Sequence, residues 1–294
     1  MNKDSLKKSL ALLLKIGVTA AALFFLYWQL DWPKLVELLG ASRWAAFIPA
    51  FLLYMLSKVA SAIRLNDYFR GIGLQISPIQ NLKLYWLGMF YNFFLPGGIG
   101  GDGYKVFLLN KKRGASVKLL TGAVVLDRAI GVMALGLMLL ALAPLLPLAL
   151  PWRWAAWLVL PLGVFAGFWL LGWLWPKHMA GRTKGILLSL FVQVLQILSV
   201  AFVAYAFRYD DSQLSLAFVF MVSSVVSALP ISIGGLGARE ATFFLGAEWL
   251  ALDPNKAVAI AFGFYLLNVF SSLAGLYYHI RKIDWNEPAK QIEK

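Results

Sequence analysis

The 294-residue chain contains no cysteine and only two histidines, His178 and His279. Without cysteine it can form no disulfide, use no thiolate nucleophile and build no cysteine-ligated metal site. Two histidines are too few for a zinc cluster. We therefore expect neither a metal nor another cofactor.

Charged residues are also scarce, at 14% of the chain, and acids are the scarcer sign: 14 Asp and Glu against 27 Lys and Arg. Hydrophobic residues make up 61%, and the mean hydropathy is +0.73. A soluble domain of this length could not bury so much apolar surface, so the bilayer is the expected solvent. The basic residues lie in short loops between apolar runs. This favours a positive-inside pattern near anionic headgroups over nucleic-acid binding.

Six apolar runs are long enough to cross a bilayer, which takes about 20 helical residues. They cover residues 10–30, 44–63, 119–142, 154–175, 186–207 and 257–280. Two further runs, 82–95 and 216–229, are too short to cross, and each leads into a proline and a glycine-rich turn.

The two glycine-rich turns are near copies of each other. Residues 95–105 and 229–239 both read L-P-x-x-I-G-G-x-G-x-[K/R]. Interrupted apolar segments at corresponding places in two halves indicate the binding site of a repeat-built transporter. If each short segment turns at its glycines and leaves on the side from which it came, nearly all basic loops collect on one side. If each crossed instead, the basic group from Lys111 to Lys184 would lie outside.

The positive-inside rule favours the first arrangement. We predict an all-α polytopic membrane protein with six full transmembrane helices plus two re-entrant helical hairpins, the first entering from the cytoplasm and the second from outside. Residues 1–294 form one membrane domain, with inverted repeats at approximately 44–143 and 184–282. Both termini are expected in the cytoplasm of a bacterium, with the chain in its inner membrane.

Irregular backbone at membrane depth requires protein or trapped water to satisfy its polar groups. The glycines permit sharp turns and close approach of a ligand. The helix leaving each turn points its positive end toward the midplane, where an anion is favoured. Close helix packing through small residues is the alternative explanation of the glycines.

Ionisable side chains within membrane segments are costly and mark functional sites by default. We hypothesise that Arg239 and Lys105, at matching motif positions, hold a phosphate, while Asp127 or Glu240 balances the charge or carries a coupling proton. Structural ion pairs, such as Asp127 with Arg239, are the alternative. Lys58 is interpreted as a snorkelling cation. The candidate substrate-binding residues are Gly98, Gly100, Gly101, Asp102, Lys105, Asp127, Arg128, Gly234, Gly235, Gly237, Arg239, Glu240 and Asn92.

Nucleotide binding is not expected. Gly98, Gly100 and Gly103 match G-x-G-x-x-G, but that fingerprint needs a preceding strand in a βαβ unit. No Walker A motif is present. Nothing in the sequence pairs the embedded carboxylates with a nucleophile or metal, so we expect no catalytic residues and no enzyme activity.

The segments F-L-P-G-G-I-G-G-D-G (94–103), Asp127-Arg128 and P-I-S-I-G-G-L-G-A-R-E (230–240) resemble the lysylphosphatidylglycerol synthase transmembrane-region family, also called flippase-like integral membrane proteins. The resemblance covers roughly residues 10 to 282. Many members carry a small residue and Arg where this chain has Gly103 and Lys105. The resemblance implies a lipid translocase. The short tail after residue 282 leads us to expect a stand-alone protein without a synthase domain.

The expected function is therefore that of a flippase or scramblase, which moves a phospholipid or a lipid-linked anionic headgroup across the cytoplasmic membrane. A secondary transporter of a small anion is one alternative. A non-transporting subunit that presents a lipid to a partner enzyme is another. The headgroup, the direction, the energy source and the choice between a homo-oligomer and a partner enzyme stay open.

Overall fold

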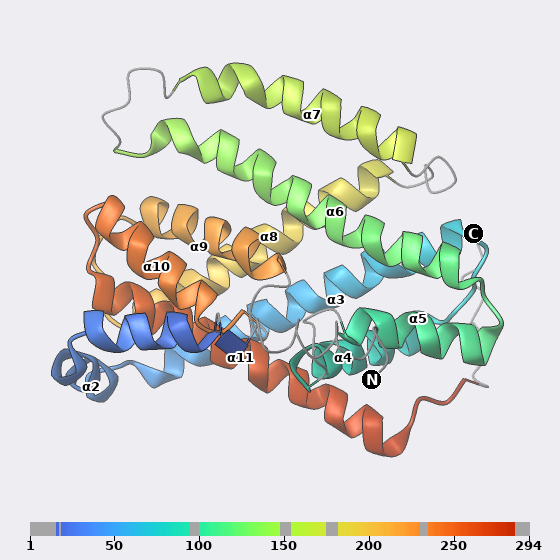
Figure 1. Cartoon of the computed structure of the whole chain (residues 1–294), viewed down its shortest axis with the longest axis horizontal. Helices are drawn as coiled ribbons and strands as arrows, with labels where there is room; N and C mark the ends of the chain where they lie inside the picture. The colour runs from blue at the N-terminus through green and yellow to red at the C-terminus, as the bar shows by residue number, and fades with distance from the viewer. Residues whose placement is uncertain are drawn as a thin grey trace.

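The structure is a computed structural model that describes residues 16–17, 19–94, 100–147, 154–174, 182–229 and 235–285. Within these ranges every regular element is helical, which confirms the predicted all-α class. A helical segment at 19–29 comes first. It is followed by α2 (Trp32–Gly40), η1 (Trp44–Ala46), α3 (Phe47–Gly71), α4 (Pro78–Phe94), α5 (Gly100–Arg113), α6 (Val117–Leu142), η2 (Ala143–Leu145), α7 (Ala155–Leu174), α8 (Arg182–Ala206), α9 (Gln213–Ala228), α10 (Ala238–Trp249) and α11 (Pro254–Arg281), arranged as in Figure 1.

Four helical segments in the described part are long and apolar enough to cross a membrane: Trp44–Gly71, Val117–Leu145, Thr183–Ala206 and Pro254–Arg281. They match four of the six predicted spans. The predicted span at 10–30 lies partly outside the described residues, and α7 occupies most of the predicted span at 154–175.

One predicted boundary is wrong. The predicted second span ended at Ile63, with Arg64 after it, but α3 continues to Gly71 and Arg64 is only 6% exposed. Arg64 is therefore a residue of the helix interior and not of a loop.

The helices follow the same order of lengths twice. The first half has α3, α4, α5 and α6, with 25, 17, 14 and 26 residues. The second has α8, α9, α10 and α11, with 25, 16, 12 and 28 residues. At a rise of about 1.5 Å per residue the four short helices span roughly 18–26 Å, less than the bilayer core of about 30 Å.

Contacts between helices also repeat when the two halves are exchanged. Helices α3 and α8 pack against each other at the centre. Helix α4 packs on α11 of the other half, as α9 packs on α6. Within each half the two short helices form a hairpin, α4 with α5 and α9 with α10.

The two hairpins open at opposite ends of the molecule. At one end Gln80 and Arg113, from the outer ends of α4 and α5, donate to the carbonyl oxygens of Asp284 and Trp285 just after α11, at 3.1 and 3.0 Å. At the other end the backbone N–H of Asp253, just before α11, donates to the Asp211 carboxylate before α9 at 3.1 Å. Because α11 runs between these ends, the inner ends of the four hairpin helices face the middle of the molecule. Figure 1 shows α9–α10 on the left and α4–α5 on the right.

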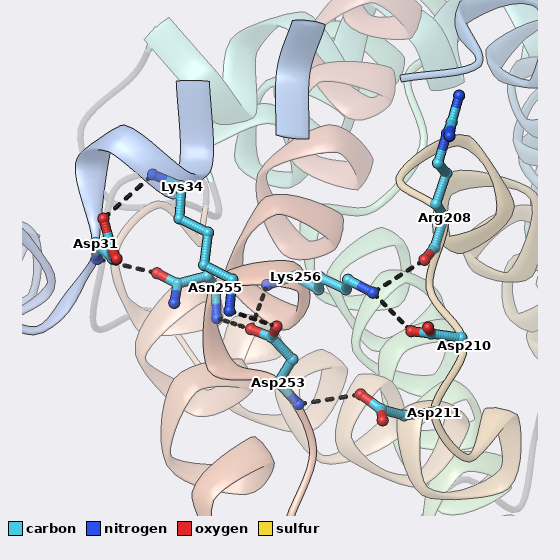
Figure 2. Close-up of polar contacts among 8 residues, drawn as sticks. All are labelled: Asp31, Lys34, Arg208, Asp210, Asp211, Asp253, Asn255 and Lys256. Atoms are coloured by element: carbon cyan, nitrogen blue, oxygen red, sulfur yellow. Dashed lines mark hydrogen bonds and ion pairs between the residues drawn. The ribbon is translucent and has the colours of Figure 1, made fainter. Parts of the chain in front are cut away.

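The end where α9–α10 opens carries charges of both signs, paired with each other (Figure 2). Lys34 Nζ lies 2.9 Å from Asp253 Oδ2, and Lys256 Nζ lies 2.6 Å from Asp210 Oδ1. The hydrogen bond to Asp253 raises the pKa of Lys34. Burial pushes the pKa of Asp253 upward, but Lys34 and backbone donors outweigh it and hold that pKa below its usual value.

The opposite end is basic. The last turn of α5 carries Lys111, Lys112 and Arg113, and the last turn of α11 carries Arg281. The two ends of the molecule therefore differ strongly in charge.

Candidate functional site

A cavity of about 300 Å³ lies between the inner ends of the hairpin helices, and we call it the central cavity. Its wall is formed by residues of α3, α4, α6, α8, α9, α10 and α11. Three cations line it, Lys58, Arg128 and Arg239, and no carboxylate does so among the described residues. The neutral polar side chains on its wall are Tyr54, Tyr85, Asn92, Gln193, Gln196, Ser224, Ser227 and Asn268.

Helix α10 begins at the second glycine motif in a way that places Arg239 at its N-terminus. Gly235 and Gly237 have φ values of +87° and +78°, a region that side chains other than glycine disfavour. Glu240 Oε2 accepts a hydrogen bond from the Gly237 N–H at 2.7 Å, which is the N3 half of a capping box. Glu240 therefore caps the helix through this oxygen and forms no ion pair with Arg239 among the described contacts.

Arg239 is 7% exposed, yet its Nε and Nη1 atoms have no hydrogen-bond partner in the described part of the chain. Its guanidinium lies over the Phe264 ring, 5.0 Å from the ring centre. Buried donors are nearly always paired in proteins, and a buried cation without a carboxylate is more costly still. The side chain is thus arranged for an acceptor that the described chain does not supply.

Lys58 is a second cation that has no carboxylate partner among the described residues. Its Nζ lies 4.3 Å from the centre of the Tyr54 ring, and that ring meets the Phe264 ring edge-on at 5.2 Å between centres. Tyr54 also donates its hydroxyl to Asn268 Oδ1 at 2.7 Å. Two touching rings therefore hold Lys58 and Arg239 on the same wall.

The snorkelling interpretation of Lys58 is wrong. The residue stands near the middle of α3, so at about 1.5 Å per residue it lies roughly 16–20 Å from either helix end. A lysine side chain cannot bridge that length to an interface.

Two neutral side chains on the same wall have unpaired atoms. Gln193 Oε1 and Ser227 Oγ are buried and lack hydrogen-bond partners in the described residues. The Asn92 side chain already has one hydrogen bond. Its Oδ1 accepts from the Gly101 N–H at 2.9 Å, which joins α4 to α5.

A second cavity of about 250 Å³ adjoins the first and shares Tyr85, Asn92 and Arg128 with it. We call it the carboxylate cavity, because Asp102 and Asp127 line it.

Each carboxylate in this second cavity is bound by cations. Asp102 bridges Arg128 and Lys105, whose Nζ is 2.9 Å from Asp102 Oδ1. Asp127 Oδ1 lies 2.7 Å from Arg64 Nε. The suggested ion pair of Asp127 with Arg239 is therefore wrong, and Asp127 pairs with Arg64.

The matched motif positions differ in charge. Lys105 and Arg239 align, but Asp102, which binds Lys105, aligns with Leu236. Among the aligned positions only the first motif thus carries a counter-ion; in the second motif Glu240 follows Arg239, and its described hydrogen bond is with the Gly237 N–H. Lys105 lines only the carboxylate cavity, whereas Arg239 lines only the central cavity.

The glycines of the first motif serve different purposes. A Cβ atom on Gly101 would overlap the carbonyl oxygen of Gly88, so Gly101 permits the close contact of α4 with α5. A Cβ on Gly103 would meet nothing within 4 Å. Gly100 begins α5. Gly98 and Gly234 lie outside the described residues.

The structure brings Asn92, Asp102, Lys105, Asp127, Arg128 and Arg239 to the two adjoining cavities. Sequence reasoning missed Lys58 and Arg64 as site residues. Their central or buried places on α3 were the available signal, since an embedded cation is a candidate by default. No cluster of His, Asp and Glu suited to a metal occurs in the described segments.

Two comparisons with known proteins relate this chain to membrane proteins. The sequence profile described as the lysylphosphatidylglycerol synthase TM region matches residues 12–186 and 180–275. Over 123 residues the chain is 27% identical to a UPF0104 membrane protein of Pyrococcus horikoshii. That match covers 41% of this chain and 36% of the relative, so the aligned part spans about a third of the relative's length. Because the profile covers most of its length, this chain belongs to the lysylphosphatidylglycerol synthase TM-region family.

Proposed function

We propose that the protein is a lipid translocase that binds an anionic headgroup in the central cavity. The observation that carries the proposal is Arg239, a buried guanidinium with two unpartnered nitrogen atoms, which lines this cavity beside Lys58. Cations and amides that line a cavity without carboxylates favour a negative ligand. The family is named for the membrane region of a phospholipid-modifying enzyme, which supports a lipid as the source of that charge.

In the proposed membrane arrangement the chain has six full spans and two re-entrant hairpins, α4–α5 and α9–α10. The basic end faces the cytoplasm together with both termini, and the mixed-charge end faces outward, in accord with the positive-inside rule. The repeated order of helix lengths and the opposite openings of the hairpins support an inverted repeat. We place the protein in a bacterial inner membrane.

This arrangement suggests how transport proceeds. The headgroup enters the central cavity between the hairpin tips while the acyl chains stay in the bilayer. One repeat then rocks against the other, so that the cavity opens to each leaflet in turn. Arg239 and Lys58 replace the water that the headgroup loses, and the amides on the cavity wall supply neutral hydrogen bonds.

The topology can be tested by labelling, because the chain has no cysteine. A cysteine at Lys112 should be shielded from a membrane-impermeant reagent in intact cells, and a cysteine at Asp210 should react. Reaction of the first from outside would refute the re-entrant arrangement.

Transport itself is tested in proteoliposomes with fluorescent phospholipids and dithionite. We expect the natural chain to flip lipids in a headgroup-selective way, and Arg239→Gln and Lys58→Gln to lose most of that activity. Lys111→Gln is the matched control, because Lys111 is an exposed cation at the end of α5. Folded protein that flips no headgroup, with or without an ion gradient, would overturn the proposal.

A further inference from the structure

We propose that the central cavity recognises a dianionic phosphate, of the monoester or diphosphate class, in preference to the singly charged phosphodiester of common phospholipids. The inference deepens the proposed function, and it rests on that function where it assigns the phosphate to a lipid. It is carried by the charges around the two cavities.

The buried centre carries two positive charges in excess. Five cations line the cavities, and the carboxylates available to them are Asp102, Asp127 and Glu240. The cations are Lys58, Arg64, Lys105, Arg128 and Arg239. Uncompensated charge is expensive at this depth, so a ligand of charge −2 would neutralise the centre and a ligand of charge −1 would leave half of the excess.

Three of the five cations, Lys58, Arg128 and Arg239, line the central cavity. Arg64 is satisfied by Asp127, and Asp102 binds both Lys105 and Arg128. Neither Lys58 nor Arg239 has a carboxylate partner among the described residues. Lys58 and Arg239 thus contribute two charges without a paired counter-ion. Asp102 leaves one of its two cations uncompensated, and Glu240, next to Arg239, removes one charge, so the net excess is two.

The geometry of these two side chains suits one shared ligand. Their cationic groups lie over the Tyr54 and Phe264 rings, which are in edge contact. Arg239 has unpaired donors at Nε and Nη1, on different edges of its guanidinium, and the Lys58 ammonium adds a point charge. A terminal phosphate offers three oxygens with two charges, whereas a diester offers only two oxygens that share one.

The asymmetry of the repeats points the same way. An acid at position 236 would repeat the arrangement of Asp102 with Lys105 and neutralise Arg239 internally. The chain has Leu236 there instead. The cation of the first motif is therefore held in an ion pair, whereas Arg239 keeps unpaired donors although Glu240 follows it in the chain.

The test is a binding titration with purified protein in uncharged detergent, followed by the fluorescence of its tryptophans. The probes are short-chain phosphatidic acid, short-chain phosphatidylglycerol with the same acyl chains, and inorganic phosphate. We expect phosphatidic acid to bind at least about tenfold more tightly than phosphatidylglycerol at pH 8, the effect of roughly one extra charge contact. The preference should shrink toward pH 5, because the phosphate monoester dianion takes up a proton near pH 6 and becomes singly charged.

The variants test the charge count. Lys58→Gln or Arg239→Gln should reduce the preference for phosphatidic acid to about threefold or less, while Lys111→Gln leaves it intact. Lys58 is only half-buried and packs beside neutral polar groups, so Lys58→Gln keeps the test available if Arg239→Gln does not fold. A preference that survives Lys58→Gln in folded protein would overturn the assignment.

The remaining outcomes separate the inference from the proposed function. Equal binding of the two lipids by the natural chain, or binding of neither, would overturn the dianion and leave the translocase to be judged by the flipping assay. Inorganic phosphate that binds as tightly as phosphatidic acid and competes with it would support the dianion but contradict a lipid source. Tight binding of phosphatidic acid together with weak binding of inorganic phosphate would support both the dianion preference and the lipid source.

Discussion

Replacing Gly101 with alanine tests whether the first glycine motif exists for close helix packing. The new Cβ would overlap the carbonyl oxygen of Gly88 on α4, a backbone atom that cannot rotate away. It would also lie 2.9 Å from Asn92 Oδ1, which accepts the hydrogen bond from the Gly101 N–H. Helices α4 and α5 must therefore separate at the tip of their hairpin.

The expected cost can be assembled from these contacts. Overpacking of this kind costs about 1–3 kcal/mol, and the loss of the hydrogen bond adds about 0.5–1.5 kcal/mol. The higher helix propensity of alanine offsets at most about 1 kcal/mol of this destabilisation. We expect Gly101→Ala to lower the free energy of unfolding by roughly 2–3 kcal/mol.

The matched control is Gly103→Ala in the same helix. Gly103 is exposed, and a Cβ there would meet nothing within 4 Å, so only the propensity gain remains. We expect this variant to be as stable as the natural chain or more stable by up to about 1 kcal/mol. Thermal unfolding in detergent, followed by tryptophan fluorescence, measures both. Equal unfolding temperatures for Gly101→Ala and the natural chain would refute the close-packing role.

Three further predictions use the ion pairs and the motif asymmetry. Arg64→Met leaves the buried Asp127 carboxylate without its counter-ion and should lower the free energy of unfolding by about 3–5 kcal/mol, measured by thermal unfolding. The double variant Arg64→Met with Asp127→Leu should recover most of this loss, and an equally unstable double variant would contradict the prediction. Leu236→Asp supplies an internal counter-ion and should abolish the preference for phosphatidic acid, while the uncharged Leu236→Asn keeps it; equal effects in the titration would refute the charge argument. The contact of Lys34 with Asp253 stabilises the fold above about pH 4, where the lowered pKa of the acid keeps it ionised, and below about pH 10.4, where the raised pKa keeps the amine charged. Asp253→Asn should thus destabilise the fold slightly at pH 7, by less than about 1 kcal/mol, and the difference should shrink as the pH falls through the lowered pKa of Asp253.

Much of the architecture follows from length and hydropathy. The two runs at 82–95 and 216–229 are too short to span, and both end as hairpin helices that turn at a glycine motif. Arg239 was a predicted site residue because it matched Lys105 in a repeated pattern. The structure places Arg239 in the central cavity and Lys105 in the carboxylate cavity.

Pairing between distant residues could not be predicted. Arg64 and Asp127 are 63 positions apart on different helices, and hydropathy ended the first of these helices at the charge itself. Hydropathy averaged over neighbouring residues drops at any charged residue. It therefore places a helix end there, even where the charge is buried against a counter-ion from another helix. The interpretation of Lys58 failed for a related reason. Its ammonium lies over the ring of Tyr54 and lines a cavity that is formed mainly by other helices, which the local sequence does not show.

The most direct test of the central claim is the flipping of fluorescent lipids in proteoliposomes, with the natural chain compared with Lys58→Gln, Arg239→Gln and Lys111→Gln. We predict headgroup-selective flipping that both cavity variants abolish and the control retains. Equal flipping by all four folded proteins would show that the central cavity does not hold the transported group.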